Sequence, residues 1–345
     1  MLMVIFGAGA SYDSAASLRP GINFPQRPPL ANDLFHHRDE FGQYAQKYTP
    51  LSNVIERLRG RNSNVEAVLQ RWRDEGEADK WPERLRQLMA VKYYLRDVLT
   101  YCTDRWSSRV CSATNYGPLL DDIGKWHFDQ KQVNPVSLVT FNYDRLLDLA
   151  IQRAALAPTF GATINSYLTS HPVFSLFKLH GSVNWVRVCR HLAIDARVPQ
   201  DVIDHAVELR GQQCSEFDIS SNPDEVRRQH ALLIPALAIP VQEKGTFECP
   251  ESHVERLREL IRVVRKILVI GWRGTETHFL DLLRRQLQKL DALMVVDRDK
   301  AAANNIAMLL RERLGPPSEQ ASIEPFDGGF SDLINTAETE RFLYS

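Results

Sequence analysis

The stretch Pro135–Ala150, PVSLVTFNYDRLLDLA, decides the fold of this chain. The run Val136–Val139 is short, mostly apolar and β-branched, which is typical of a buried strand. From Leu146 onward the apolar residues follow the spacing of a helix with one buried face. A buried strand that leads directly into a helix is the repeating unit of α/β proteins with a parallel sheet.

Three polar residues connect this strand to its helix, namely Thr140, Asn142 and Asp144. They occupy every second position at the carboxyl end of the strand, which is where open α/β sheets bind their ligands. We therefore expect all three to contact a polar ligand. The alternative is that Asn142 or Asp144 only caps the helix, a role that both residue types fill well. A cap explains one of these residues but not all three.

The first strand of the chain runs directly into a glycine-rich turn, GAGAS, at residues 7–11. Two glycines separated by one residue allow a tight turn and let backbone N–H groups approach a pyrophosphate. The predicted phosphate-binding residues are Gly7, Ala8, Gly9 and Ser11. Tyr12 stands where a dehydrogenase would have its third glycine, so the motif is not the dehydrogenase version. The alternative is a glycine turn with no ligand.

Further strands are predicted at Leu2–Phe6, Phe174–Leu179, Ile267–Ile270 and Leu293–Val296, and Leu232–Pro235 is predicted to be a short strand or an extended segment. Most of them are separated by segments with helical spacing, such as Phe279–Leu290. Strands that alternate with helices in this way predict a mostly parallel sheet with helices on both faces.

The chain has 345 residues, which favours either one large domain with insertions or two domains. We predict a single domain over residues 1–345, with a helical insertion at 51–132 and an irregular insertion at 186–230. Within the helical insertion, one long amphipathic helix is expected from Leu85 to Trp106. The aromatic and Arg residues of this insertion suit a protein interface. The alternative is an internal helical core that is covered by Arg side chains.

Three other strand ends carry residues that suit ligand binding. His180 follows the strand Phe174–Leu179, where an imidazole is placed for acid–base chemistry near neutral pH. Gly271 begins a turn after its strand, and Asp297 ends the next strand, where its carboxylate can accept from ribose hydroxyls. The alternatives are a structural His and an Asp297 that caps the helix Lys300–Arg313.

The formal net charge of −1 predicts no direct nucleic-acid binding and no attraction to an anionic membrane surface. No apolar run approaches the roughly 18 residues needed to span a bilayer. The amino terminus lacks a basic leader, which predicts no secretory signal. The five Cys lack close paired spacing, so we expect reduced thiols and a cytoplasmic protein. A zinc site formed by Cys189, His191, Cys214 and Cys249 is the less favoured alternative.

Taken together, these motifs resemble those of the sirtuin-like NAD-binding family. The matching pieces follow the order of the family: GAGAS at 7–11, TFNYD at 140–144, KLHGS at 178–182, the turn at Gly271, and Asp297. The resemblance covers most of the chain outside the helical insertion. It implies a Rossmann-like α/β fold and NAD as the ligand.

The resemblance also implies a role for each matching residue. The glycine-rich turn would hold the phosphates of NAD. Asn142 would orient the nicotinamide ribose or an attacking water, and His180 would act as the base. Asp144 would contact the carboxamide of nicotinamide.

Two departures separate this chain from protein-deacylating sirtuins. Those enzymes resemble one another in a four-Cys zinc module after the His, whereas the corresponding interval here holds only Cys189 and Cys214. The large helical insertion is also foreign to them. Both features look like the bacterial sirtuin-like effectors of antiphage defence, which hydrolyse NAD on infection, often beside a partner ATPase or an Argonaute-like sensor protein.

We therefore predict an NAD glycohydrolase that takes NAD as its substrate and uses no metal. The alternatives are a zinc-free NAD-dependent deacylase and a non-catalytic sensor of NAD or ADP-ribose. An unrestrained NAD hydrolase would deplete a pool that its own cell needs. We therefore expect control by assembly, in a homo-oligomer that contacts its neighbours partly through the helical insertion and biases the loop Leu18–Pro29.

Overall fold

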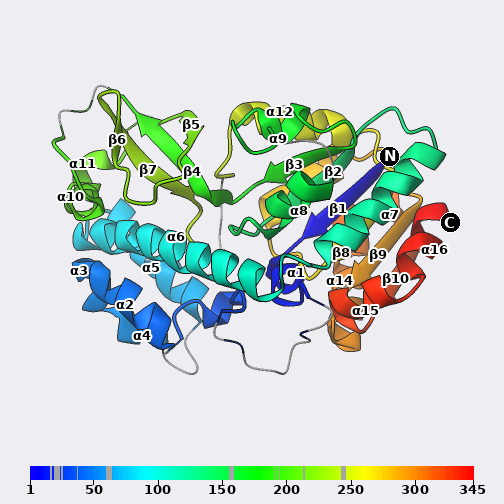
Figure 1. The fold of residues 1–345 in the computed structure, drawn as a ribbon, viewed down its shortest axis with the longest axis horizontal. Helices are drawn as coiled ribbons and strands as arrows, with labels where there is room; N and C mark the ends of the chain where they lie inside the picture. The colour runs from blue at the N-terminus through cyan, green and yellow to red at the C-terminus, as the bar shows by residue number, and fades with distance from the viewer. Residues whose placement is uncertain are drawn as a thin grey trace. The chain divides into compact units, whose positions relative to one another are not determined.

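A computed structural model describes residues 1–15, 18, 24, 26–36, 38–59, 64–154, 159–190, 192, 194–212, 214–241 and 246–345. The chain forms two units (Figure 1). Unit 1 consists of Met1–Pro28, Thr103–Leu179 and Glu251–Ser345, and unit 2 consists of Pro29–Cys102 and His180–Pro250. The chain therefore leaves unit 1 twice and returns to it twice.

Unit 1 is built on a six-stranded sheet in the order β10-β9-β8-β1-β2-β3, in which every neighbouring pair is parallel. Its strands are β1 (Leu2–Phe6), β2 (Val136–Thr140), β3 (Phe174–Lys178), β8 (Lys266–Ile270), β9 (Ala292–Val296) and β10 (Ser322–Phe326). Helices flank the sheet, so the predicted Rossmann-like α/β fold is confirmed (Figure 1). The edge strand β10 was not predicted.

The strand order has its switch point beside β1. The chain adds β2 and β3 on one side of β1, and then β8, β9 and β10 on the other. Ligands of such sheets bind at the carboxyl ends of the strands next to the switch point. The glycine-rich turn after β1 and the turn after β8 both lie at that edge of the sheet.

In unit 1, helices lie between successive strands along the chain and follow the last strand. They are α1 (Ala8–Tyr12), α7 (Tyr116–Asp129), α8 (Leu146–Ala154), α9 (Ser166–Thr169), α12 (Glu251–Ile261), α13 (Thr277–Gln286), α14 (Lys300–Leu314), α15 (Gly329–Asn335) and α16 (Glu338–Tyr344), with the 3-10 turn η2 (Pro316–Ser318). Every residue of β1 and β2 is buried, which explains why their sequences are mostly apolar.

Unit 2 combines helices with a second sheet. Its helices are η1 (Ala31–Asp33), α2 (Asp39–Lys47), α3 (Thr49–Ser52), α4 (Ile55–Arg59), α5 (Val65–Glu77), most of α6 (Glu83–Arg109), α10 (Pro199–Asp204) and α11 (Ala206–Leu209). The long helix expected over Leu85–Trp106 is confirmed as part of α6. Among the described residues, no helix is both long and apolar enough to cross a membrane.

The second sheet was not predicted. It is antiparallel, in the order β5-β4-β7-β6, and consists of β4 (Gly181–Cys189), β5 (Glu216–Ile219), β6 (Arg227–Arg228) and β7 (Ala231–Leu237). Only the segment within β7 was expected to be extended. The interval 186–230, expected to be irregular, therefore contains strands that pair with one another and with β7.

The expectation of reduced thiols is wrong for two cysteines. Cys189 and Cys214 form a disulfide, with their Cα atoms 4.6 Å apart. It joins the end of β4 to the segment before β5, a pairing that the separation of 25 residues along the chain did not reveal. Cys102 and Cys249 are buried free thiols, and Cys111 is an exposed one. The cysteines therefore no longer support the prediction of a reducing compartment.

Candidate functional site

The glycine-rich turn after β1 is shaped by its contact with the turn after β8. The Gly7 amide donates to the Ile270 carbonyl oxygen, and the Gly9 amide donates to that of Gly271, each over 3.1 Å. A Cβ atom on Gly7 would lie 2.5 Å from the Gly271 carbonyl oxygen, and one on Gly9 would lie 2.8 Å from the Gly271 Cα. The two turns can approach this closely only because both carry glycine.

At Gly271 a side chain is excluded by the backbone of the glycine-rich turn. The φ of Gly271 is +60°, and a Cβ there would lie 2.5 Å from the carbonyl carbon of Gly9. Backbone packing alone thus requires Gly7, Gly9 and Gly271, whether or not a phosphate binds. The role of the first turn in holding phosphates stays a prediction, as does that of Ala8, which is exposed at the start of α1.

Asn142 joins the β2 strand end to the glycine-rich turn. Its side-chain amide nitrogen donates to the Gly7 carbonyl oxygen over 2.9 Å and to the Ser11 Oγ over 3.0 Å. Its backbone N–H donates to the Thr140 Oγ1 over 3.0 Å. The Ser11 hydroxyl also shares a 3.0 Å hydrogen bond with the Tyr116 hydroxyl of α7. The structure thus brings together four of the predicted site residues: Gly7, Ser11, Thr140 and Asn142.

Asp144 is buried and already has a structural partner. Its Oδ1 accepts from the backbone N–H of Leu146, the first residue of α8, over 3.0 Å. The carboxylate therefore satisfies one amide at the start of α8, as a helix cap does. Burial raises the pKa of the Asp144 carboxyl, while the Lys178 ammonium and hydrogen bonds from Leu146 and Ser11 act to lower it. Contact with a carboxamide stays a prediction for this residue.

A buried ion pair that no sequence pattern predicted lies next to Asp144. The Lys178 Nζ donates over 2.6 Å to the backbone carbonyl oxygen of Asp144 and over 2.8 Å to the Asp148 Oδ2. The Tyr167 hydroxyl donates to the Asp148 Oδ1 over 2.8 Å. The sequence did carry a signal, because each charge interrupts an apolar segment: Lys178 ends the strand FSLFK, and Asp148 sits within LLDLA.

Two aromatic side chains brace the polar loop against the turn after β8. Phe141 stacks on Trp272, with ring centroids 5.2 Å apart and planes 14° apart. Phe279 of α13 packs edge-on against both rings. These contacts fix the residues that flank Asn142 and Gly271 in sequence. They were not predicted, because they join segments about 130 residues apart in the chain.

His180 is the first residue of unit 2 and is buried. Its backbone carbonyl oxygen accepts from the Ala238 amide over 3.0 Å, which ties it to the end of β7. Gly181, which follows, has a φ of +78°. His180 thus lies in the turn between β3, which ends at Lys178, and β4, which begins at Gly181. Its role as a base beside Asn142 stays a prediction.

Asp297 follows β9 and is half-buried. Its Oδ1 accepts from the Asp299 amide over 3.0 Å. The cap of α14 is Asp299, whose Oδ1 accepts from the Ala302 amide over 2.7 Å, so the capping alternative is wrong for Asp297. Binding of a ribose hydroxyl by Asp297 stays a prediction.

Half of the loop Leu18–Pro29, which assembly is expected to bias, lies outside the described residues, as does His191. The described end of the loop carries Arg27, which is buried. Its Nη1 donates to the Tyr12 carbonyl oxygen over 2.7 Å, and its guanidinium lies 4.8 Å from the Trp106 ring centroid. In the described part of the chain, no group of three or more His, Cys, Asp or Glu side chains could hold a metal ion.

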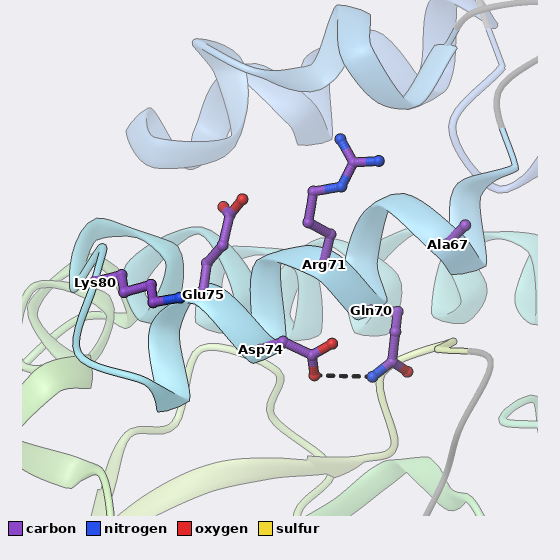
Figure 2. Close-up of a pocket in the computed structure, with 6 residues that line it drawn as sticks. All are labelled: Ala67, Gln70, Arg71, Asp74, Glu75 and Lys80. Carbon is purple, nitrogen blue, oxygen red and sulfur yellow. Dashed lines mark hydrogen bonds between the residues drawn. The ribbon is translucent and has the colours of Figure 1, made fainter.

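A separate surface hollow of about 360 Å³ lies along α5 in unit 2 (Figure 2). It is lined by Ala67, Gln70, Arg71, Asp74, Glu75 and Lys80. Gln70 donates to Asp74 over 2.9 Å, and Glu75 is paired with Arg84. Acidic and basic side chains are balanced around the hollow, and it contains none of the predicted site residues. It is not the predicted NAD site.

No protein-family model matches the chain, and no curated protein matches it in sequence. Among solved structures it is similar to a mutant Sir2 homologue in complex with ADP-ribose, at 12% identity and a TM-score of 0.43, covering 99% of this chain and 91% of that one. It is also similar to Sir2 with a p53 peptide and NAD⁺, at 13% identity and a TM-score of 0.37, covering 99% and 93%. These likenesses concern the fold alone.

Proposed function

We propose that this protein is an NAD glycohydrolase, which converts NAD and water into nicotinamide and ADP-ribose. The observation that carries the proposal is the position of Asn142. Its side chain bridges the β2 strand end and the glycine-rich turn, beside the switch point of a parallel sheet. Dinucleotides bind at this place in Rossmann-like folds.

The hydrogen bonds of Asn142 indicate which of its atoms would act. Its amide nitrogen donates to Gly7 and Ser11, which uses both of its hydrogens. The carbonyl oxygen is then the atom that would accept a hydrogen bond from a ribose hydroxyl or from the attacking water. Because the amide is fixed from two sides, that oxygen would be held in place before the ligand binds.

The proposed reaction breaks the bond between the ribose C1′ and the nicotinamide nitrogen. The electron pair of that bond stays on nicotinamide, and the oxygen of a water molecule forms the new bond to C1′. His180 would take the proton that this water loses. Asp144 would hold the nicotinamide carboxamide through the lone pairs that remain after it caps α8.

The test is release of nicotinamide from NAD by the purified full-length chain, with and without an acylated peptide. Asn142→Ala and His180→Ala should each lower the rate by about 10²–10⁴-fold, the usual range for general acid–base and positioning groups. Asn304→Ala is the matched control, because the Asn304 side chain bonds to its own helix at Lys300. Folding of each variant is checked by circular dichroism.

The other outcomes separate the alternatives. Release of nicotinamide only when an acylated peptide is present would support a zinc-free deacylase. Binding of NAD or ADP-ribose without release would support a non-catalytic sensor. Cleavage by either site variant at the wild-type rate would show that the assigned roles are wrong.

The wider proposal rests on the resemblance stated above. We propose one sirtuin-like NAD-binding domain over residues 1–345, acting in the cytoplasm as an effector of antiphage defence by NAD depletion. Its proposed partners are further copies of the chain and a partner ATPase or Argonaute-like sensor. The helical insertion, with its aromatic and Arg residues, is the proposed contact surface.

A further inference from the structure

Lys178 and Asp148 form an ion pair inside unit 1. Their side chains are 0% and 1% exposed, and the Lys178 Nζ lies 2.8 Å from the Asp148 Oδ2. Removing two charges from water costs several kcal/mol per ion, and a well-packed apolar pair of similar volume is often as stable or more so. Stability of the fold is therefore a weak explanation for this pair.

The second partner of Lys178 suggests a different explanation. Its ammonium also donates over 2.6 Å to the carbonyl oxygen of Asp144, a backbone atom of the loop between β2 and α8. One residue further on, the backbone N–H of Leu179 donates to the Thr140 carbonyl oxygen over 3.1 Å. Adjacent residues at the end of β3 thus hold the loop at both of its ends, Thr140 and Asp144.

Asn142 lies midway between these two fixed points. On its other side it is held by hydrogen bonds to Gly7 and Ser11. Without the Lys178 contact, the Asp144 end of the loop would lose its hydrogen bond to β3. The hydrogen bond from the Leu146 amide to the Asp144 Oδ1, over 3.0 Å at the start of α8, would remain. Asp148 fixes the ammonium directly, because its Oδ2 accepts from the Lys178 Nζ over 2.8 Å.

We propose that Lys178 is a positioning residue, which sets the loop that carries Asn142 by holding the Asp144 carbonyl oxygen, with Asp148 as its counter-charge. This inference rests on the proposed NAD cleavage. A displacement of about 1 Å in a positioned group can lower a rate by about 100-fold. Loss of the Lys178 contact therefore acts on the chemical step through Asn142, without Lys178 touching the substrate.

The test uses Lys178→Met/Asp148→Asn, which removes both charges of the pair, so that neither of the two is left without the other. The melting temperature should stay near that of the wild type. The kcat for NAD should fall by about 10–100-fold, and the KM should change less than the kcat. A wild-type kcat would overturn the proposal. Failure of the double variant to fold would also overturn it, because the ion pair would then be a structural requirement.

Tyr167→Phe is the matched control. It removes a hydrogen bond to the same buried carboxylate while leaving Lys178 and its bond to Asp144 in place. It should lower the melting temperature and keep the wild-type kcat. If Tyr167→Phe lowers the kcat as much as the double variant does, the whole cluster acts through stability and Lys178 has no positioning role.

A second readout does not depend on NAD cleavage. Amide hydrogen exchange over residues 141–146 should be at least about tenfold faster in the double variant than in the wild type, and unchanged in Tyr167→Phe. Unchanged exchange in the double variant would overturn the positioning role. If the wild type releases no nicotinamide, the proposed function fails, whereas this measurement still decides whether Lys178 sets the loop.

Discussion

The parallel sheet of unit 1 and the antiparallel sheet of unit 2 are held together by different kinds of contact. In unit 1, the central strands are fully buried, two turns meet at glycine positions, and the ion pair of Lys178 and Asp148 is inaccessible to water. In unit 2, β5 is partly exposed, and β4 is joined to the β5 region by a disulfide and by an ion pair of Arg190 and Glu216 whose side chains are about half exposed.

This difference predicts different sensitivities for the two sheets. Close packing makes unit 1 intolerant of even one added carbon atom where two backbones touch. An exposed ion pair contributes about 0–1 kcal/mol at most, so the disulfide is the stronger of these two cross-links between β4 and the β5 region. Unit 1 should therefore respond to changes in shape and buried charge, and unit 2 to changes in redox state.

The largest effect is expected for Gly271→Ala. The new methyl group would lie 2.5 Å from the Gly9 carbonyl carbon, and the residue would keep a φ of +60°. The strained backbone and the displaced turn together should lower the free energy of unfolding by about 4 kcal/mol. Urea unfolding followed by circular dichroism measures this change.

Gly124→Ala is the control for that experiment. Gly124 lies within α7, and no atom lies within 4 Å of the site where its Cβ would stand. Alanine in a helix interior should stabilise the protein by about 1 kcal/mol relative to glycine. Equal stabilities for the two variants would show that the turns of unit 1 are not closely packed.

The next effect is expected for the double substitution Cys189→Ala/Cys214→Ala. A cross-link between residues 25 positions apart restricts the unfolded chain, which corresponds to about 3.5 kcal/mol in the chain-entropy description. Hydrogen exchange in β4 and β5 should become faster, while exchange in β1 and β2 should not change.

The exposed free thiol Cys111 provides the control for this variant. Cys111→Ala should leave exchange in both sheets as it is in the wild type. A reducing agent added to the wild type should reproduce the effect of the double substitution. Slow exchange in β4 and β5 after reduction would contradict the proposed dependence of unit 2 on its disulfide.

The same contrast explains which strands could be predicted from the sequence. The strands of a parallel sheet are buried on both faces, so segments such as Val136–Thr140 and Lys266–Ile270 read as apolar runs. The strand β5 has the sequence EFDI, in which polar and apolar residues alternate over only four positions, and β6 is Arg227–Arg228, so neither is an apolar run. Their pairing depends on β4 and β7, which lie elsewhere in the sequence.

The candidate site was predictable to a similar degree. Strand ends and turn chemistry identified Gly7, Ser11 and Asn142, which the structure brings into hydrogen-bonding contact. The contact of Gly9 with Gly271 and that of Lys178 with Asp144 were missed. Both depend on which strands are neighbours and in which register, and no local pattern specifies that.

The smallest of the three effects is the loss of stability at low pH that a buried histidine of unit 1 causes. His253 of α12 is buried, and its Nε2 shares a 3.1 Å hydrogen bond with the Ile164 carbonyl oxygen. Burial lowers the pKa of His253 from the usual 6.5 to about 4, against the opposing effect of that hydrogen bond. Between these two pH values, the unfolded chain binds a proton at this residue and the folded chain does not.

The stability that neutral His253 provides is therefore complete above pH 6.5 and is lost as the pH falls towards 4. At about 1.4 kcal/mol per unit of pKa difference, the loss over this window is about 3 kcal/mol. His253→Gln keeps a donor for the Ile164 carbonyl oxygen but cannot titrate. Its free energy of unfolding should decrease less steeply with falling pH than that of the wild type. The difference between the two slopes should correspond to about one bound proton.

Stability must be compared between the wild type and His253→Gln, because other buried groups also make the stability depend on pH. Burial raises the pKa of the Asp13 and Asp144 carboxyls, so their contribution to stability increases as the pH falls towards their unfolded values. Because both carboxyls are present in both proteins, the difference between wild type and His253→Gln isolates the imidazole. Parallel curves from pH 7 to 4 would show that His253 is accessible to protons in the folded protein, against the close packing described for unit 1.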